Sequence, residues 1–507
     1  MDALMKKLVI VLLLITMVLS MLAACANSDN SDNLASSADT TTAVAPSDTS
    51  TSLDTEAEVT TEAPEYVKPE ADYTGKTFTF SSLRYENSSW VATDYTEASK
   101  PDINGDIIND SIYERIAATE DTLGITVASN LYTNTNSIMN MIMAGDYVAD
   151  CIILEGLEFE SALSKGLLYD LYEIDTLDLN ASWLDQNATE SLSLGGKLYG
   201  VVGDISPMGL LAANCVYVNR ALLTTAGLSD PAELVVSGKW TYDAMEQIGR
   251  AVANDVNGDG VMNEEDIFGL DSEPIGYIAA GSCGIVYTTK DSNDMPVLAI
   301  DQERAIAAIE KLVPLFRDKD ITLYSQDYKN GGYKNIFRDL IVQKFIEDEI
   351  LFVNNWLCVA LELRGMESDF GLLPPPKLDE QQQNYMVYNS PSWTTYSVVP
   401  KTVKEQDLDF VGDVMNALGY YGHEHIYTAL IDKTITYKSL RDEDNKQMME
   451  LIYANRIFDL ADIYDFGGIQ SMMNSFVSSN STNFASLYKA QSKIIERKIQ
   501  EIVNSLN

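Results

Sequence analysis

The part of the chain that should fold begins with alternating strands and helices. Residues 76–81 (Lys-Thr-Phe-Thr-Phe-Ser) alternate polar with aromatic and β-branched positions, which predicts a strand. Residues 109–123 carry apolar positions at helical spacing, and residues 138–143 form a second apolar helix. Further strands are predicted at 124–128 and at 150–154 (Asp-Cys-Ile-Ile-Leu). This βαβαβ order predicts an α/β fold with a mostly parallel sheet between two layers of helices.

A second set of elements follows, in which a helix at 303–316 places its apolar residues on one face. From residue 406 onward the pattern is mainly helical, and it closes with an amphipathic helix at 484–503. This order predicts a chain that crosses between two lobes more than once and has a helix-rich C-terminus. The strands predicted in this part lie at residues 214–219, 350–353, 371–373 and 396–399.

The first 25 residues have the pattern of an export signal. Lys6 and Lys7 precede an apolar run over 8–19, and Leu-Ala-Ala-Cys follows at 22–25. The apolar run is too short for a spanning helix and is typical of a signal peptide. Leu-Ala-Ala-Cys resembles the bacterial lipobox, which implies cleavage after residue 24 and diacylation of Cys25, a stable membrane anchor. The alternative is an ordinary signal peptide in which Cys25 is incidental.

Residues 26–66 are rich in Ser, Thr, Ala, Asp and Glu, with nine acids and no Lys or Arg. Burial of so few apolar residues cannot offset the conformational entropy that is lost when a chain folds. We therefore expect a disordered tether with an average reach of roughly 35 Å. No later run is long and apolar enough to span a bilayer. The expected organisation is a signal peptide at 1–24, a lipidated Cys25 with its tether at 25–72, and a folded region held at the extracellular face of the cell membrane.

Composition narrows the classes of function. The 507 residues include 34 basic and 76 acidic ones, a formal net charge of −42. A protein this acidic repels nucleic acid phosphates and anionic lipids, so no nucleic acid partner is expected. The two histidines, His423 and His425, offer almost nothing for a histidine-based catalytic centre. The five cysteines form no Cys-x-x-Cys pair, and no structural disulfide is expected.

Six short segments follow a recognisable pattern over most of residues 73–465. They are Gly-Gly-Lys-Leu-Tyr-Gly-Val at 195–201, Tyr-Val-Asn-Arg at 217–220, Gly-Lys-Trp-Thr-Tyr-Asp at 238–243, Asp-Phe-Gly-Leu-Leu-Pro at 369–374, Asn-Asp-Ser-Ile-Tyr-Glu-Arg at 109–115 and Arg-Ile-Phe-Asp at 456–459. Together they resemble extracellular solute-binding proteins of the family 1 type, and the last two resemble segments of clostridial members. Tyr242 departs from the family pattern, which has a second Trp at this position.

The resemblance implies a two-lobed type 2 periplasmic-binding-protein fold, similar to maltose-binding protein, with strands that cross at a hinge. Such proteins close on a small molecule, most often an oligosaccharide, and deliver it to an ABC permease in the membrane. The implied lobes are 73–213 with about 388–425, and 214–387 with about 426–507. A monomer is expected. Because the lobes can hinge, a ligand stabilises the closed form by contacting both of them.

Sugar rings offer flat C–H patches to aromatic faces and hydroxyls to polar side chains, which directs attention to tryptophans near strand ends. Trp356 and Trp393 lie beside predicted strands, and Trp90 lies in a polar loop after the first strand. Each of them could instead fill the core, and Trp240 is expected to do so by packing a helix onto the second lobe. The polar ligand-binding candidates are Arg84, Glu155, Asp204, Asn214 and Tyr217.

Residues 255–266 (Asp-Val-Asn-Gly-Asp-Gly-Val-Met-Asn-Glu-Glu-Asp) resemble an EF-hand or dockerin calcium loop. Oxygen ligands fall at positions 1, 3, 5, 9 and 12, with Gly at position 6 and a backbone carbonyl at position 7, as a seven-coordinate Ca²⁺ requires. A single copy argues against a dockerin, and the expected role of the ion is structural. The alternative is a polar turn without an ion. The expected ligands are Asp255, Asn257, Asp259, Val261, Asn263 and Asp266.

Other functions remain open at this point. The solute could be a peptide or another small molecule in place of a carbohydrate. Paired carboxylates could also make the protein a surface glycoside hydrolase. However, the sequence has no nucleophile elbow, histidine triad or His-Glu-x-x-His site, so no enzyme is expected. An adhesin would show repeats, and we find none.

Overall fold

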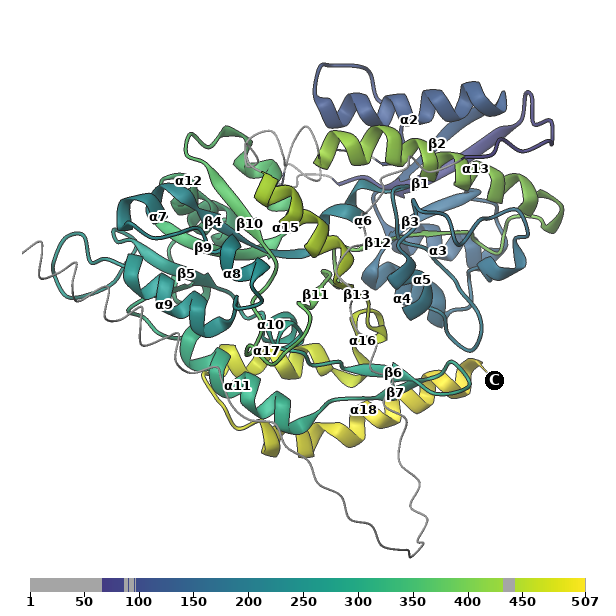
Figure 1. Ribbon diagram of the computed structural model, residues 1–507. Coiled ribbons are helices and arrows are strands. Elements are labelled where there is room, and N and C mark those ends of the chain that lie inside the picture. The colour runs from purple at the N-terminus through teal and green to yellow at the C-terminus, as the bar shows by residue number, and fades with distance from the viewer. Residues whose placement is uncertain (1–65, 86–89, 91–94, 96, 432–442, 507) are drawn as a thin grey trace, which may run out of the picture. The chain divides into compact units, whose positions relative to one another are not determined.

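The computed structural model describes residues 66–506, apart from 86–89, 91–94, 96 and 432–442 (Figure 1). Cys25, the predicted signal peptide and most of the predicted tether lie outside these residues. The described residues belong to one compact unit, residues 63–507. Among them, no helix is both long enough and apolar enough to cross a membrane.

The first sheet has four strands in the order β12-β3-β1-β2. β1 pairs in parallel with β2 and β3, as the βαβαβ pattern predicts, and β12 joins antiparallel to β3 from far along the sequence. The alternation in β1 buries Phe78 and Phe80 completely in the core. The four strands are β1 (Thr77–Leu83), β2 (Thr126–Tyr132), β3 (Cys151–Glu155) and β12 (Thr395–Val398).

Helices cover both faces of this sheet (Figure 1). The longest begins where the Asp106 carboxylate accepts hydrogen bonds from the backbone N–H of Ile108 and Asn109, and it ends at Gly124 in the left-handed region. These caps satisfy backbone groups that helix ends otherwise leave unpaired. The helices of this part are α2 (Ile107–Leu123), α3 (Thr135–Ala144), α4 (Gly156–Ser164), α5 (Gln186–Ser191), α6 (Pro207–Leu211) and α13 (Leu408–Tyr421).

The second sheet has five strands in the order β10-β4-β9-β5-β8. β4 is antiparallel to β10 and β9, whereas β5 is parallel to β9 and β8. Nearly every residue of these strands is buried, so they lack the alternation of apolar and polar residues that is typical of half-exposed strands. The strands are β4 (Asn214–Asn219), β5 (Phe268–Ser272), β8 (Thr322–Tyr324), β9 (Ile350–Trp356) and β10 (Phe370–Leu373).

Helices also pack on this second sheet, and Trp240 fixes one of them. Its fully buried ring lies 5.5 Å from the ring of Phe352, and its indole N–H donates to the carbonyl of Pro374 at 2.9 Å. Trp240 therefore packs in the core, as expected from the sequence. The helices here are α7 (Arg220–Ala226), α8 (Ala232–Val236), α9 (Tyr242–Val252), α11 (Gln302–Phe316), α12 (Gln343–Ile346) and α15 (Glu443–Ala454).

Three chain segments run side by side where the chain passes between the two sheets. Ala213 pairs with Asn389, and the side-chain amide of Asn389 donates to the carbonyl of Ile457 at 3.1 Å. β11 (Val387–Tyr388) pairs in parallel with β13 (Arg456–Ile457). These segments connect the parts of the chain that form the two sheets, where the sequence analysis expects the hinge. The lobe boundaries stay a prediction.

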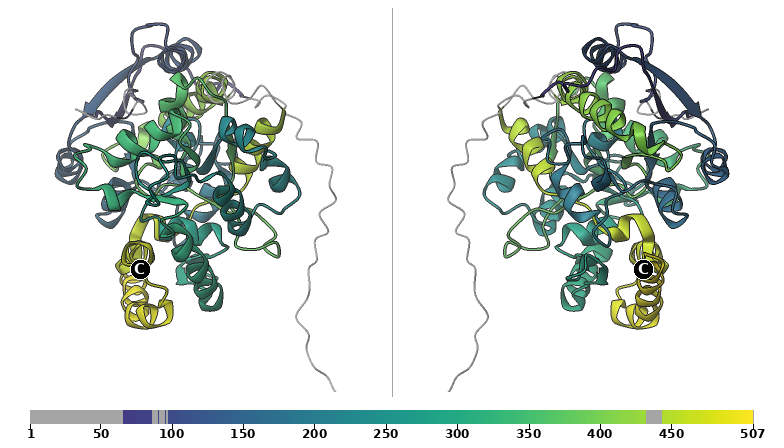
Figure 2. Two further views of the ribbon diagram at one scale, coloured as in Figure 1. Left: turned by 90° about the vertical axis from the view of Figure 1, so that its left-hand side faces the viewer. Right: turned by 90° about the vertical axis from the view of Figure 1, so that its right-hand side faces the viewer.

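The C-terminal region is helical, as predicted, and packs beside α11 (Figure 2). Its last helix begins at Phe484, the residue where the sequence predicts it to begin. The four cysteines of the described residues are free and buried. The elements of this region are α16 (Leu460–Tyr464), α17 (Ile469–Ser479) and α18 (Phe484–Leu506). Three elements from the middle of the chain lie beside them: α10 (Gly276–Ser282) packs on α17, and β7 (Pro296–Leu298), which pairs with β6 (Thr288–Lys290), packs on α18.

Candidate functional site

A cavity of about 210 Å³ opens among loops that extend from strands of both sheets. Trp90 follows β1 and Trp393 precedes β12 in the first sheet, whereas Trp356 ends β9 in the second. The structure thus brings together the three tryptophans predicted as ligand contacts. The residues that line the cavity are Trp90, Glu273, Asn335, Phe337, Asn355, Trp356, Cys358 and Trp393.

Aromatic rings stack on the walls of this cavity. The ring of Trp90 lies 5.9 Å from that of Phe337, with 30° between their planes. Trp393 stacks on Tyr85 at 6.2 Å and 22°. Stacked neighbours hold a ring in one orientation, so its exposed face is ready for a flat apolar ligand surface. Tyr85 follows the end of β1, where the sequence places it, and Phe337 is an aromatic residue that the sequence analysis missed.

A tight turn sets the position of Trp393. The hydroxyl of Ser390 accepts a hydrogen bond from the backbone N–H of Trp393 at 3.1 Å. The hydroxyl of Thr394 donates back to the carbonyl of Ser390 at 2.7 Å. The Ser-Pro-Ser-Trp sequence therefore folds on itself just before β12 and presents the indole at the end of the strand.

Glu273 is the acidic residue of the cavity, and it follows the carboxyl end of β5. Its carboxylate lies 3.5 Å from the side-chain amide nitrogen of Asn355, at the outer limit of a hydrogen bond. Burial raises the pKa of Glu273 to about 7. The sequence analysis missed this residue because it predicted no strand over Phe268–Ser272.

Glu155 lies at the end of β3, where the sequence analysis placed it, and lines a smaller adjoining cavity. Trp393 lines both cavities, so it separates Glu155 from Glu273. Burial raises the pKa of Glu155 to about 8, and the negative charge of Glu158 adds to this effect. The smaller cavity also contains Glu97, whose pKa burial raises as well.

Comparison with known proteins gives a clear result for the fold. No protein-family model matches the chain, and no curated protein sequence matches it. Its structure is similar to that of an ABC substrate-binding protein from Listeria monocytogenes solved with cycloalternan, with a TM-score of 0.53 at 14% identity over 85% of this chain and 99% of that one. A maltose-binding periplasmic protein from the same organism, solved with maltose, gives 0.52 at 13% identity over 84% and 98%.

A sugar transporter protein from Rhizobium etli, solved in an open conformation, is similar as well, with a TM-score of 0.55 at 11% identity over 84% of this chain and 99% of that one. This chain has the two-lobed fold of the periplasmic binding proteins. The resemblance stated from the sequence is therefore confirmed at the level of the fold. In the binding-protein fold the ligand cleft lies at strand ends between the lobes, which is where the tryptophan-lined cavity opens.

Two of the predicted ligand residues, Tyr217 and Asn214, do not line the cavity. They are buried in the core and bind the backbone of a strand that ends in the cavity. Tyr217 is fully buried, and its hydroxyl lies 3.0 Å from the backbone carbonyls of Trp356 and Leu357. Asn214 is buried in β4 and donates its amide to the carbonyl of Asn355 at 3.2 Å. Both side chains thus hold the end of β9, which carries Trp356 into the cavity.

The remaining two polar candidates lie elsewhere. Asp204 is buried beside His423, whose ring nitrogen Nδ1 lies 2.6 Å from its carboxylate. Arg84 is exposed after β1, and its backbone N–H donates to the carbonyl of Tyr132 at 2.8 Å. Neither residue is among those that line the two cavities.

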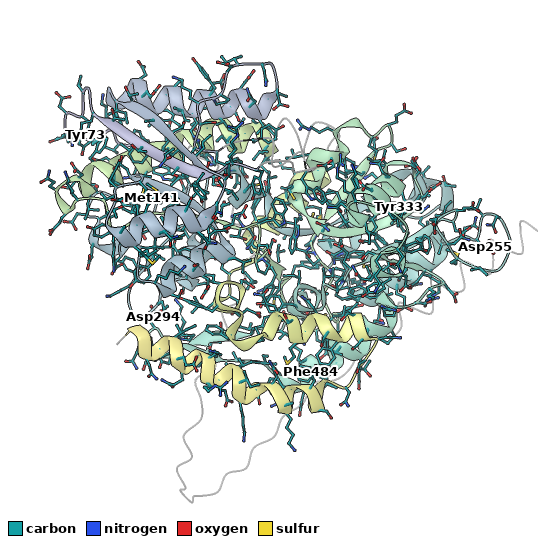
Figure 3. All side chains as sticks on the ribbon, turned by 180° about the vertical axis from the view of Figure 1, so that it is seen from behind. Tyr73, Met141, Asp255, Asp294, Tyr333 and Phe484 are labelled. Atoms are coloured by element: carbon teal, nitrogen blue, oxygen red, sulfur yellow. The ribbon has the colours of Figure 1, made fainter. Side chains whose placement is uncertain are left out.

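The predicted calcium loop precedes β5 of the second sheet, with Asp255 at the periphery of the molecule (Figure 3). Reciprocal backbone hydrogen bonds between Asn254 and Ile267 close its base, at 2.9 and 3.1 Å. The Asp255 carboxylate accepts from the N–H groups of Gly258 and Gly260, each at 2.7 Å. Gly260 has a φ of 81°, a conformation that favours glycine and lets the chain turn sharply here.

The other end of the loop is closed by Asp266. Its fully buried carboxylate accepts from the N–H groups of Val256 and Asn263, at 3.0 and 2.8 Å. Carboxylates from both ends therefore turn into the loop, and the donors are all oxygens, which suits a hard cation. Among the described residues, no group of three or more His, Cys, Asp or Glu side chains is arranged to hold a metal, so a site here would also need Asn257, Asn263 and a carbonyl.

Proposed function

We propose that this protein is the substrate-binding component of an ABC importer and that it captures a carbohydrate, an oligosaccharide by preference, in the tryptophan-lined cavity. The observation that carries the proposal is the meeting of Trp90, Trp356 and Trp393 from both sheets in one cavity of the binding-protein fold. Structural neighbours solved with cycloalternan and maltose support it.

The mechanism follows from the hinge. Because the crossing segments are short strands, the lobes can rotate about them while each lobe keeps its own packing. A sugar that stacks on Trp393 from one side and on Trp356 from the other gains contacts only when the lobes approach. The ligand therefore stabilises the closed form, which is the form that we expect the permease to bind. We propose that the protein works as a monomer and releases the ligand unchanged, without catalysis.

A thermal-shift panel of oligosaccharides, peptides and polyols tests this proposal. We expect the melting temperature to rise with at least one oligosaccharide, because a ligand that binds only the folded state stabilises it. Analysis of the sugar after incubation should find it intact. A rise with peptides and with no sugar would overturn the carbohydrate assignment, and cleaved sugar would indicate a hydrolase.

We also propose that Cys25 is diacylated and holds the protein at the extracellular face of the cell membrane. The lipobox-like Leu-Ala-Ala-Cys and the acidic segment after it support this proposal. In cells that express the wild type and a Cys25→Ser variant, the wild type should fractionate with membranes and the variant should not. Equal membrane association of both proteins would contradict a lipid anchor on this residue.

We further propose that residues 255–266 hold one structural Ca²⁺. The supporting observations are the all-oxygen donor set and the two terminal carboxylates, Asp255 and Asp266, that turn into the loop. The ion would add positive charge to a segment that holds five acids and no base. It would fix this surface loop against the second sheet.

A further inference from the structure

The cleft is acidic and lacks positive charge on its described lining. The larger cavity contains Glu273, and the smaller one contains Glu97 and Glu155, whereas no Lys, Arg or His lines either cavity in the described part of the chain. The charged residues that line the two cavities in the described part of the chain are therefore all acidic.

Two arginines near the cleft already have partners. Arg115 is fully buried and donates to the backbone carbonyls of Ile205 and Glu97. Arg364 donates to Asp106 at 3.1 Å and to the hydroxyl of Tyr95 at 2.8 Å. These two guanidinium groups already bind backbone carbonyls or side chains of other segments, so they are poorly placed to neutralise a carboxylate in the cavity.

Glu273 and Glu155 have no ion pair among the described residues. The side chain of Glu273 is held only by the 3.5 Å contact with the amide of Asn355, and the acidic group beside it is Asp271, whose pKa is raised well above its ordinary value by burial. The charged neighbour of Glu155 is Glu158. A buried carboxylate without a partner is costly, and closing the lobes would remove more water from both groups.

Building on the proposed function, we propose that the ligand is an amino sugar, an oligosaccharide with a protonated amine, whose ammonium group lies against Glu273 between the faces of Trp356 and Trp393. An ammonium group supplies the positive partner that the Glu273 carboxylate lacks. It is also attracted to the faces of tryptophan rings, where it gains further when water is excluded. The same cleft repels uronic acids and sugar phosphates, because their charge meets unneutralised carboxylates.

An amino sugar bound in this cleft should change the protonation of the two glutamates. Burial raises the pKa of Glu273 to about 7 and that of Glu155 to about 8, so both hold part of a proton near neutral pH. A bound ammonium stabilises the charged carboxylate and lowers its pKa. Binding of an amino sugar at a pH where its amine is already protonated should therefore release protons, whereas a neutral sugar should leave the carboxylates protonated.

Isothermal titration calorimetry distinguishes these cases with three matched ligands: glucosamine oligomers, their N-acetylated forms and neutral glucose oligomers of equal length. We expect the glucosamine oligomer to bind at least about tenfold more tightly than its acetylated form, with an affinity that falls as salt rises. Repeating the titration in buffers of different ionisation enthalpy should reveal proton release with the amine only.

Single substitutions show which carboxylate is responsible for the preference for the amine. Glu273→Gln should remove most of the preference for the amine while it retains the affinity for neutral oligomers, and Glu155→Gln should reduce the number of protons released. Glu310→Gln, an exposed substitution on α11, removes the same charge outside the cleft and should change nothing. Equal affinity for amine and neutral oligomers, unaffected by Glu273→Gln, would overturn this inference and leave the proposed function standing. Failure of all three sugars to bind would instead count against the proposed function.

Discussion

Trp90 and Trp393 reach the cavity from loops and Trp356 from the end of β9, and all three are partly buried against the core. Trp356 and Trp393 are half-buried, in contrast to the fully buried Trp240. Their exposed faces are therefore available to a ligand. The hydroxyl of Tyr217 and the amide of Asn214 hold the backbone of β9 beneath Trp356, which limits the motion of that indole.

Trp356→Ala and Trp393→Ala should each weaken oligosaccharide binding by at least about 2–13-fold, since an aromatic contact contributes about 0.5–1.5 kcal/mol beyond the area that it buries. Titration calorimetry measures the loss. Tyr172→Ala, which removes an exposed ring outside both cavities, is the matched control and should bind like the wild type. Unchanged affinity in both tryptophan variants would mean that the ligand binds elsewhere.

The carboxyl of Glu155 should make stability depend on pH in a predictable direction. Its pKa is raised by burial to about 8, so the folded state holds a proton that the unfolded chain releases above about pH 4.5. The free energy of unfolding therefore falls as pH rises through this window. Glu155→Gln cannot ionise and should be more stable than the wild type near pH 9, with a difference on the order of 3 kcal/mol that vanishes near pH 4.

Urea denaturation at several pH values measures this difference. Glu310→Gln should show no such divergence from the wild type, because its side chain is exposed. A gap between Glu155→Gln and the wild type that is the same at every pH would show that the carboxyl of Glu155 is not buried as described.

Single residues also show what the sequence could and could not indicate. Trp90, Trp356 and Trp393 were identifiable because each lies beside a predicted strand end. Tyr217 was predicted as a ligand contact, but both faces of β4 are buried, so its ring has no route to the cleft. Glu273 could not be found, since the short strand before it contains Gly and Asp and does not have the pattern of a strand.

Among the secondary-structure elements, α4 and the Trp393 turn depend on each other. A Cβ added to Gly156, the first residue of α4, would overlap the carbonyl oxygen of Pro391. Backbone therefore packs directly on backbone, and the turn that presents Trp393 rests on the start of this helix.

Gly156→Ala should lower the free energy of unfolding by about 1–3 kcal/mol, as overpacking does, and should weaken sugar binding because Pro391 must move. Thermal unfolding and titration calorimetry measure the two effects. Gly365→Ala is the control, since a Cβ there meets no atom within 4 Å. If Gly156→Ala matches this control in both measurements, the turn does not rest on α4.

The loop at 255–266 offers a second prediction for an element. Saturating Ca²⁺ should raise the melting temperature of the wild type, and a chelator should reverse the rise; at a hundredfold excess over the dissociation constant the stabilisation is about 2.7 kcal/mol. Asp255→Ala should abolish the response, because it removes the ligand at position 1. Asp320→Ala, an exposed substitution outside the loop, should retain it. If Ca²⁺ does not change the melting temperature of the wild type, the loop is a polar turn held by hydrogen bonds, and the calcium proposal is wrong.

For the whole molecule, the sequence predicts the order of the elements better than their pairing. The βαβαβ start, three of the five strands of the second sheet (β4, β9 and β10) and the final helix were predicted from the sequence pattern, whereas β5 and β8 were not. The antiparallel addition of β12 to β3 was not, because its partners lie about 240 positions apart and local patterns carry no information on such pairs. The contacts among the crossing segments could not be predicted for the same reason, since Ala213, Asn389 and Ile457 are far apart in sequence and meet only in the folded chain.

The central claim is that the two lobes capture an intact carbohydrate between them. Its most direct test is to incubate the purified protein with a mixture of neutral and amino oligosaccharides, isolate the protein by gel filtration and identify the retained molecule by mass spectrometry. We predict one intact oligosaccharide per chain in the wild type and none in a Trp356→Ala, Trp393→Ala double variant. Retention of no sugar by the wild type, or equal retention by the double variant, would contradict the account.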